Sequence, residues 1–591
     1  MNVQERIAAL RKLMQQYKIE AWIAPSADPH QSEYVAECWK TRAWISGFTG
    51  SAGTVVITQN QAGLWTDSRY YLQADRELAG SGITLFKLGQ PEVPSYSDWL
   101  AQGLPEHATI GFDGQVFSAA QAEQLQKAVS AKQIRLNYQQ DLIAQIWHNR
   151  PAVPAQPVLE LSLEFAGESR SSKFSRMRER LSKAEADAHF ITALDDIAWM
   201  FNIRGNDVEY NPVTIAYAYL AQDDVRLFVD MAKFSTEVQT ALRRDGVTFA
   251  GYEEARTFLQ QLPQGTTVLI DPEKTSLMIK DALSQHCTIK EEQNIAFTLK
   301  AQKNETELQG IRHAHVRDGV AMVKWLFWLD QHLGKEAYTE YTVVDSLREL
   351  RSQQQYFQGL SFHPIAGYQA NAALCHYRPE PKTALTIRPE GLLLVDSGAQ
   401  YLDGTTDITR TFALSEPTAQ QKQDFTLVLK GNINLSLAKF PKGTTGAQLD
   451  ILARQALWNH GYNYGHGTGH GIGHFLNVHE GPQRIHVNNY VPLELSMVCS
   501  NEPGLYRTNQ YGIRIENTIV VIPAEATEFD IFYQFETVTL CPIDLDLVDA
   551  SLLSQAETAW LNAYHQRVYT TLSPYLAEQE RAWLRHETRT I

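Results

Sequence analysis

The last third of the chain contains five side chains that could bind metal ions. Four are carboxylates and one is an imidazole, and each lies next to a segment with a strand-like pattern. Four ionised carboxylates balance the charge of two divalent cations, and a neutral imidazole adds none, so metal binding would remove the cost of burying unpaired carboxylates. The set therefore predicts a dinuclear metallohydrolase whose metal ligands are Asp396, Asp407, His470, Glu502 and Glu516.

Asp396 and Asp407 are predicted to lie on the two arms of one hairpin. Asp396 ends an apolar run, and Asp407 follows the turn signal Asp403-Gly404. With a two-residue turn there, Asp407 would pair with Gln400, which is about 13 Å from Asp396 at ~3.3 Å per residue. Adjacent metals need a shorter separation, so we expect a bulge or a wider loop, for which Gly398 is suitable. The alternative is a pair of solvated aspartates at strand ends.

The segment YGHGTGHGIGHFLNVHEGP places His466, His470 and His474 between glycines. Glycine at every odd position from 465 to 473 disfavours a helix, so we expect an extended or looped segment. Its outer histidines would then lie up to about 26 Å apart, so at most one is expected to bind metal directly. No Gly-rich phosphate pattern is present. One such histidine is easily explained as a hydrogen-bonded structural residue, but three of them with His479 nearby are not.

The two glutamates of the set are predicted to lie where strands end or alternate. Glu502 opens the turn Glu-Pro-Gly after an apolar run, and Glu516 shares one face of YGIRIEN with Arg514. An ordinary Arg–Glu strand pair is the alternative explanation of Arg514 and Glu516. Oxygen-rich ligation with one nitrogen and no thiolate favours hard cations, so we expect two divalent ions per subunit. Manganese is the first choice, and cobalt or zinc could substitute.

Composition describes a folded protein of several domains. At 591 residues the chain is long enough for three or four domains of roughly 100–200 residues. A net charge of −15 without a basic stripe argues against nucleic acid as a partner. No run is apolar enough for a signal peptide or a membrane span, and the five cysteines contain no CxxC pair. We therefore expect a cytoplasmic protein with reduced thiols and no membrane partner.

Two breaks divide the chain. Three prolines between Arg150 and Pro157 predict a linker, and the order of predicted elements before it recurs after it, as in a duplicated α/β domain. Asn304 and Glu307 can form a capping box, which predicts a long helix to about His332. The expected organisation is an α/β domain over residues 1–150, a second over 158–300, an α+β catalytic domain over 301–542 and a helical C-terminal extension over 543–591.

These motifs resemble those of the pita-bread metallopeptidases, a family that includes methionine aminopeptidase, prolidase and Xaa-Pro aminopeptidase. The resemblance is carried by two aspartates eleven residues apart, GHGTGHGIG with VHEGP, NEPGLY and GIRIEN. The segments NAALCHYRP and DITRTF and the tail from Cys541 are most similar to the long cytosolic Xaa-Pro aminopeptidases. The match is dense over roughly residues 300–570. It implies two non-catalytic, creatinase-like N-terminal domains, a pita-bread catalytic domain and a homodimer.

The resemblance also implies roles for individual residues. It marks the same five side chains as metal ligands, with Asp407 and Glu516 bridging the two ions, and places His376, His466 and His479 around the substrate. It assigns no role to His474. The implied substrate is a peptide with proline in the second position, whose N-terminal Xaa-Pro bond is hydrolysed. A hydroxide shared by the metals would be the nucleophile, Glu502 would carry its proton, and His479 and His376 would stabilise the oxyanion.

Two other functions are compatible with parts of this pattern. A prolidase would cut only Xaa-Pro dipeptides with the same metals, but the extra α/β domain and the tail favour an aminopeptidase. A catalytically inactive pita-bread binding module, or a metal-free amidinohydrolase like creatinase, would lack metal ligands. All five are present here.

Overall fold

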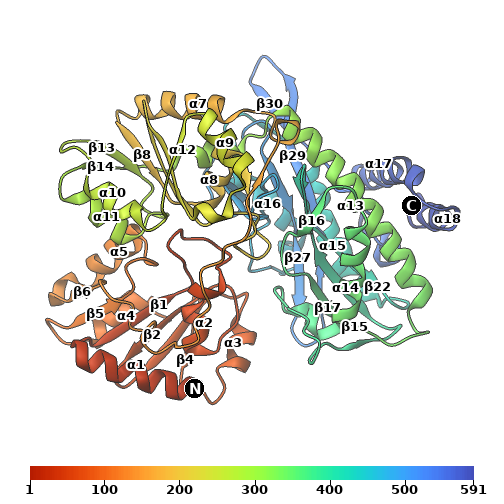
Figure 1. Cartoon of the computed structure of the whole chain (residues 1–591). Coiled ribbons are helices and arrows are strands. Elements are labelled where there is room, and N and C mark those ends of the chain that lie inside the picture. The colour runs from red at the N-terminus through yellow and green to blue at the C-terminus, as the bar shows by residue number, and fades with distance from the viewer. The chain divides into compact units, whose positions relative to one another are not determined.

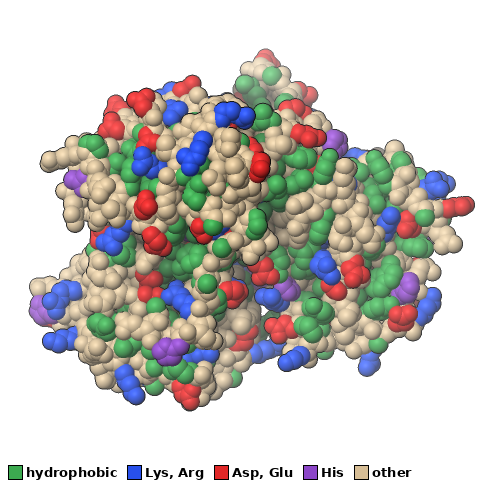
Figure 2. All heavy atoms as spheres, viewed as in Figure 1, with side chains coloured by type: hydrophobic (Ala, Val, Ile, Leu, Met, Phe, Trp, Pro, Cys, Tyr) green, Lys and Arg blue, Asp and Glu red, His purple; other side chains and the backbone are tan.

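The computed structural model describes residues 1–591, which fold into two compact units (Figure 1). Unit 1 comprises Met1–Leu161 and Glu168–Phe297, and unit 2 comprises Ser162–Gly167 and Thr298–Ile591. Unit 1 contains both predicted α/β domains, and the finer boundaries stay predictions. On the face shown in Figure 2, Lys and Arg side chains are interspersed with Asp and Glu. None of the helices combines the length and apolar character needed to cross a bilayer.

Unit 1 contains two six-stranded sheets with the same connectivity. The strand orders are β4-β3-β2-β1-β5-β6 and β12-β11-β10-β8-β13-β14. In each sheet a central strand (β1 or β8) pairs antiparallel with one neighbour and parallel with the other. The recurrence of predicted elements is therefore confirmed as a repeated topology. The strands are β1 (Ala21–Pro25), β2 (Thr54–Thr58), β3 (Ala62–Thr66), β4 (Thr84–Lys87), β5 (Thr109–Phe112), β6 (Arg135–Asn137), β8 (Ala188–Ile191), β10 (Ala216–Ala221), β11 (Val225–Val229), β12 (Val247–Ala250), β13 (Thr267–Ile270) and β14 (Thr288–Glu291).

Helices cover these sheets, which explains why β1 and β8 are buried along their whole length. Polar residues define where the helices begin. Asn2 forms a capping box with Glu5, and Ser169 accepts the backbone N–H of Ser172. The helices of unit 1 are α1 (Val3–Tyr17), α2 (Thr41–Ser46), α3 (Tyr71–Glu77), α4 (Tyr96–Gly103), α5 (Ala119–Val129), α7 (Arg170–Lys183), α8 (Leu194–Phe201), α9 (Thr236–Arg244), α10 (Glu254–Gln260) and α11 (Leu277–Ser284).

Unit 2 contains the long helix α13 (Glu305–His332), as the capping box predicts. Asn304 accepts the N–H of Glu307, and the Glu307 carboxylate accepts the N–H of Asn304. The buried side chains of Met322 and Trp325 pack in one cluster with apolar residues of β19 (Leu392–Ser397) and β22 (Ile408–Ala413). The helix therefore packs on the sheet that carries Asp396.

The remaining strands of unit 2 form several sheets. The largest has the order β23-β30-β29-β26-β24-β25, and smaller ones are β17-β19-β22, β16-β20-β21 and β27-β28. Their bounds are β16 (Phe357–Leu360), β17 (Ile365–Tyr368), β20 (Ala399–Tyr401), β21 (Gly404–Thr405), β23 (Lys439–Pro441), β24 (Gly469–Gly471), β25 (Glu480–Ile485), β26 (Val498–Asn501), β27 (Gly504–Arg507), β28 (Tyr511–Arg514), β29 (Asn517–Ala526) and β30 (Ile531–Thr537).

Further helices of unit 2 are α6 (Leu163–Ala166), α14 (Glu340–Ser352), α15 (Ala419–Ser436), α16 (Gly446–Trp458), α17 (Gln555–Leu572) and α18 (Glu578–Glu587). Leu561 and Val568 of α17 share a buried cluster with Phe425 and Leu429 of α15. The predicted helical extension is thus present, and it covers apolar surface of unit 2.

The hairpin between Asp396 and Asp407 differs from the predicted one. Its turn lies at residues 402–403, because Tyr401 pairs with Gly404. Gly404 is in a strand that approaches α13, where an added Cβ would lie 3.0 Å from the Ala314 side chain. The glycine interpreted as a turn signal instead lies in a strand packed closely against α13.

The predicted register shift was also wrong. Asp396 pairs with Thr409, and Gln400 pairs with Thr405 in the same register, so no residue is inserted. In this register Asp407 lies two residues from the partner of Asp396 on the same face, which is within diagonal reach. The pairing is interrupted at Gly398, where the hairpin divides between two sheets.

Replacing Gly398 by alanine tests this close approach. An added Cβ would lie 2.0 Å from the Thr406 carbonyl oxygen and 2.2 Å from Ser361 Oγ. We expect Gly398→Ala to destabilise unit 2 by about 1–3 kcal/mol, which is typical of overpacking, and to lower its thermal midpoint. The control is Gly103→Ala, where nothing lies within 4 Å of the added Cβ. An unchanged midpoint for Gly398→Ala would contradict the packing argument.

Candidate metal centre

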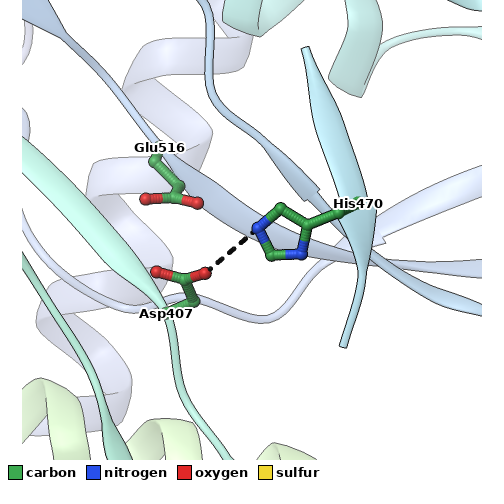
Figure 3. A group of neighbouring side chains, drawn as sticks. All are labelled: Asp407, His470 and Glu516. Atoms are coloured by element: carbon green, nitrogen blue, oxygen red, sulfur yellow. Dashed lines mark ion pairs between the residues drawn. The ribbon is translucent and has the colours of Figure 1, made fainter. Parts of the chain in front are cut away.

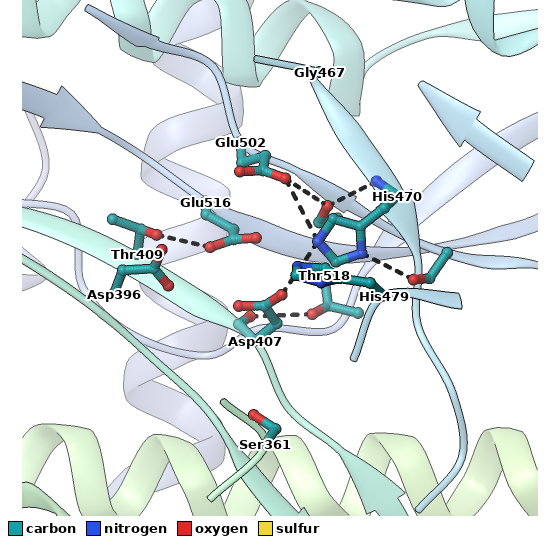
Figure 4. A network of polar contacts seen from close by, with 12 residues as sticks. Ser361, Asp396, Asp407, Thr409, Gly467, His470, His479, Glu502, Glu516 and Thr518 are labelled. Carbon is teal, nitrogen blue, oxygen red and sulfur yellow. Dashed lines mark hydrogen bonds and ion pairs between the residues drawn. The ribbon is translucent and has the colours of Figure 1, made fainter. Parts of the chain in front are cut away.

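The five predicted ligands come from five segments that meet in one place. Asp396 lies in β19, and Asp407 directly precedes β22. His470 is the middle residue of β24, Glu502 follows β26, and Glu516 lies between β28 and β29. One potential ligand atom from each of Asp407, His470 and Glu516 lies within 4.8 Å of the other two. Figure 3 shows these three side chains pointing toward one another. Figure 4 shows Asp396 and Glu502 beside the same group.

Burial divides the group into a closed side and a more open side. The side chain of Asp407 is 5% exposed and that of Asp396 is 12% exposed, and Glu516 is buried. The side chains of His470 and Glu502 keep 15% and 18% of their area exposed. A substrate would therefore approach from the side of His470 and Glu502.

Hydrogen bonds orient the imidazole of His470. Its Nδ1 lies 2.9 Å from the Gly471 carbonyl oxygen, so Nδ1 carries the proton in this contact. Its Nε2 lies 3.5 Å from both Asp407 Oδ2 and Glu502 Oε1. The nitrogen that faces the carboxylates is therefore the one available to bind a cation.

Neighbouring hydroxyl groups hold two of the carboxylates. Ser500 Oγ donates to Glu502 Oε1 at 3.2 Å and accepts the backbone N–H of His470 at 3.0 Å. Thr409 Oγ1 donates to Glu516 Oε2 at 2.7 Å. Each hydroxyl leaves the second carboxylate oxygen available to a cation, as expected for residues that support metal ligands.

Asp396 is held by an arginine. Its Oδ2 accepts a hydrogen bond from Arg514 Nη2 at 2.5 Å, whereas its buried Oδ1 has no hydrogen-bond partner in the protein. A buried acceptor without a partner is costly, and a metal ion would satisfy it. Arg514 also donates to Tyr506 Oη at 2.7 Å and to Thr409 Oγ1 at 3.2 Å.

Burial and mutual repulsion shift the acidity of the group. Burial and then the neighbouring charge of Asp407 hold the pKa of Glu516 well above its usual range. Burial, opposed by His470 and Arg514, raises the pKa of Glu502 to about 7. Burial lowers the pKa of His470, but its contacts with Asp407 and Glu502 outweigh that effect and raise it to about 9. These shifts favour protonation of Glu502, Glu516 and His470 when no cation is bound.

The charge balance differs from the predicted one because of Arg514. Two divalent cations and four carboxylates sum to zero, and the buried guanidinium adds one positive charge. Without cations, burial and then the negative charge of neighbouring carboxylates raise the pKa values of Glu502 and Glu516. The donor set of carboxylate oxygens with one imidazole nitrogen fits hard divalent cations.

The three histidines predicted to surround the substrate have different neighbours. The ring of His479 lies edge-on to His470, with centroids 4.4 Å apart. His466 Nε2 lies 2.8 Å from Tyr506 Oη and is thereby linked to Arg514. His376 follows Cys375, whose carbonyl oxygen accepts from Arg514 Nη2 at 3.4 Å. Their roles stay predictions.

Sequence reasoning did not identify the residues that support the ligands. Ser500 lies in β26, two residues before Glu502, and Thr409 lies in β22, two residues after Asp407. Residues two positions apart share a face of a strand, so this alternation could have indicated both. Tyr506 has no such signal, because its contact with His466 joins residues forty positions apart. Arg514 was placed on the face of Glu516, but its main partner is Asp396.

Family models cover the chain in four segments. Residues 6–144 and 149–307 each match a creatinase/prolidase N-terminal domain. Residues 309–523 match metallopeptidase family M24, and residues 531–591 match the C-terminal region of that peptidase.

Known proteins are similar over the whole chain. A probable Xaa-Pro aminopeptidase P of Laccaria bicolor is 42% identical over 603 residues, covering 99% of this chain and 93% of that protein. The X-prolyl aminopeptidase of Caenorhabditis elegans, described as a cytosolic enzyme with a di-nuclear active site, has a TM-score of 0.96 and 35% identity, covering 100% of both chains. A prolidase of Thermococcus sibiricus, at 20% identity and a TM-score of 0.51, covers 64% of this chain and 98% of that one and shares the fold alone. The predicted fold class, two creatinase-like domains before a pita-bread domain, is confirmed.

Metal binding should release protons. At neutral pH and without cations, His470, with a pKa of about 9, is expected to be protonated. Glu502, with a pKa of about 7, is expected to be protonated in part of the molecules. Because cations need both groups deprotonated, affinity for Mn²⁺ should rise with pH up to the His470 pKa of about 9, by up to about tenfold per pH unit for each proton released.

Calorimetry in two buffers with different enthalpies of ionisation measures the number of protons released. His460→Gln, at an exposed position in unit 2, serves as the control and should release as many protons as the unmodified chain. A heat of binding that is independent of the buffer would contradict the shifted pKa values.

Proposed function

Because the chain belongs to metallopeptidase family M24, we propose that it hydrolyses the bond between an N-terminal residue and a following proline. The proposal rests mainly on the similarity of the whole chain to Xaa-Pro aminopeptidases. The grouping of four carboxylates and an imidazole in one place is consistent with it. Relatives similar over the whole chain are Xaa-Pro aminopeptidases, which favours the aminopeptidase over the dipeptidase.

Two divalent metal ions per subunit are part of the proposal, with Mn²⁺ as the first choice. The five predicted ligands, Asp396, Asp407, His470, Glu502 and Glu516, would hold them. When bound, such ions activate water and polarise the scissile carbonyl. A dinuclear site is described for the C. elegans enzyme, and the partnerless Asp396 Oδ1 supports a cation here.

Glu502 is the residue proposed to move the proton. A pKa raised to about 7 lets a carboxylate both accept and return a proton near neutral pH. The group is only partly buried and is held by Ser500, so its second oxygen can face the reacting atoms. It would take the proton of the attacking water and give it to the leaving nitrogen.

The neighbouring histidines would orient the peptide. His479, packed edge-on against His470, lies close enough to the predicted ligands to donate to a developing oxyanion. His466 and His376 would contact the substrate on the side of Arg514 and Tyr506. An Xaa-Pro bond has no N–H, so recognition must use the shape of the proline ring.

Two properties of the whole protein remain part of the proposal. The C. elegans enzyme is described as cytosolic, and we propose the same compartment for this chain. A homodimer is proposed as well. It is supported by the apolar side chains of Ile451 and Trp458, which are 48% and 45% exposed and lie two helical turns apart on α16. A mass in solution equal to that of two chains would support the dimer, and a mass equal to that of one chain would contradict it.

A peptide assay tests the activity. We expect a tripeptide Xaa-Pro-Yaa to be cleaved to the free amino acid and Pro-Yaa, because the chain resembles aminopeptidases over its full length. The matched dipeptide Xaa-Pro and the peptide Xaa-Ala-Yaa should be poor substrates. Chelation should abolish cleavage and Mn²⁺ should restore it. Preferred cleavage of the dipeptide would identify a prolidase, and no cleavage with added Mn²⁺ would refute the enzymatic proposal.

Replacing Glu502 by glutamine tests the proton transfer. Glutamine keeps the shape but cannot accept the proton, so kcat should fall by about 10²–10⁴-fold at saturating Mn²⁺. Metal content measured in the same samples separates this loss from loss of the ions. Glu528→Gln, at an exposed position of the β29–β30 hairpin, should behave like the unmodified enzyme. Unchanged turnover in Glu502→Gln would assign the proton to another group.

A further inference from the structure

Helix α16 is joined to the loop that precedes β24 by one arginine. Arg454 Nη1 donates to the Tyr464 carbonyl oxygen at 2.8 Å and to Asn463 Oδ1 at 3.1 Å. Its Nη2 donates to the His466 carbonyl oxygen at 2.8 Å. The guanidinium also lies over the Tyr464 ring, 3.9 Å from its centroid. One side chain therefore fixes the backbone at both ends of the segment from Tyr464 to His466.

An aspartate one turn earlier in α16 completes this attachment. Asp450 Oδ2 accepts from Arg454 Nε at 2.7 Å, and Asp450 Oδ1 accepts from Thr468 Oγ1 at 2.6 Å. The Thr468 hydroxyl is also 2.5 Å from Tyr464 Oη. Both carboxylate oxygens thus have a partner, and the two anchors bracket the loop.

The pair lies in the interior. Asp450 is 0% exposed and Arg454 is 4% exposed. Two buried charges are retained at a desolvation cost that a packed apolar pair would avoid, so their contacts call for an explanation beyond stability. The fork of the guanidinium reaches several acceptors at once, which a lysine cannot do.

The loop leads directly to two predicted metal ligands. The Thr468 carbonyl oxygen accepts the backbone N–H of Glu502 at 2.8 Å. His470 follows Thr468 by two residues, and a Cβ at the intervening Gly469 would lie 2.0 Å from the Ser500 carbonyl oxygen. Figure 4 shows Gly467 and His470 on the same segment beside Glu502. A displacement of Thr468 would therefore move His470 and Glu502 together.

We propose that Asp450 and Arg454 are positioning residues, which set the separation of His470 and Glu502 by fixing Thr468 and the loop from Tyr464 to His466. This inference rests on the proposed metal-dependent function. The pair touches neither a ligand side chain nor the substrate, and it acts through the backbone of the loop. A pair with a purely structural role would affect folding stability but not the geometry of bound metal.

Two sets of variants separate these roles. Arg454→Lys keeps the charge but loses the fork, and Thr468→Val removes only the hydroxyl that joins the loop to Asp450. Thr468→Ser restores that hydroxyl. Arg170→Lys is the matched control, because Arg170 is also buried, pairs with Glu160 and Asp245, and donates to the Phe201 carbonyl oxygen within unit 1.

Binding of Co²⁺ and its d–d absorption spectrum report ligand geometry without any peptide, and peptide turnover is measured separately. We expect Arg454→Lys and Thr468→Val to weaken Co²⁺ binding about 10- to 100-fold and to change the spectrum, as supporting residues of metal sites typically do. Their kcat should fall more than their KM rises. Thr468→Ser and Arg170→Lys should keep the spectrum of the unmodified protein, although Arg170→Lys lowers the thermal midpoint.

The outcomes distinguish the inference from the proposed function. If folded Arg454→Lys and Thr468→Val bind Co²⁺ with unchanged affinity and spectrum, the positioning role is wrong. The same conclusion follows if Thr468→Ser behaves like Thr468→Val. If the unmodified protein binds Co²⁺ but cleaves no peptide, the proposed function fails while the Co²⁺ data still test the positioning role.

Discussion

The repulsion among four carboxylates that share one buried space is the constraint on which unit 2 depends. Folding brings them together although burial, and then the charge of Asp407, raises the pKa of Glu516, while the guanidinium of Arg514 pairs with Asp396. Such an arrangement is stable only with bound protons or cations. Hydroxyl groups and an arginine bind one oxygen each of Glu502, Glu516 and Asp396 and leave the other oxygen available.

Arg514 joins the two sides of the centre. It neutralises Asp396 on the closed side and donates to Tyr506, which in turn contacts His466 on the substrate side. A change in charge among the predicted metal ligands can thus alter the electrostatic potential at His466, which is proposed to contact the peptide. The link consists of ordinary hydrogen bonds between named atoms, and it requires no movement of the backbone.

Much of this arrangement could be predicted from sequence, because strand ends and strand alternation carry local signals. Glu502 and Glu516 lie where the apolar runs indicated, and the capping box at Asn304 marks the start of α13. The hairpin turn was misplaced by one residue, because Gly404 serves close packing against α13 rather than the turn. Residues such as Tyr506 could not be found, since their contacts join segments whose pairing no local pattern specifies. Spacing alone could not select His470 among the histidines either, and the family resemblance made that choice.

The scattering of the ligands over five segments has a consequence for how the protein matures. The centre does not exist until β19, β22, β24, β26 and β28 have assembled, so an unfolded chain offers no equivalent site. Ions that bind only the folded form stabilise it by mass action. Bound metal would therefore slow the proteolysis of unit 2, in which all five predicted ligands lie, because proteases attack the opened chain.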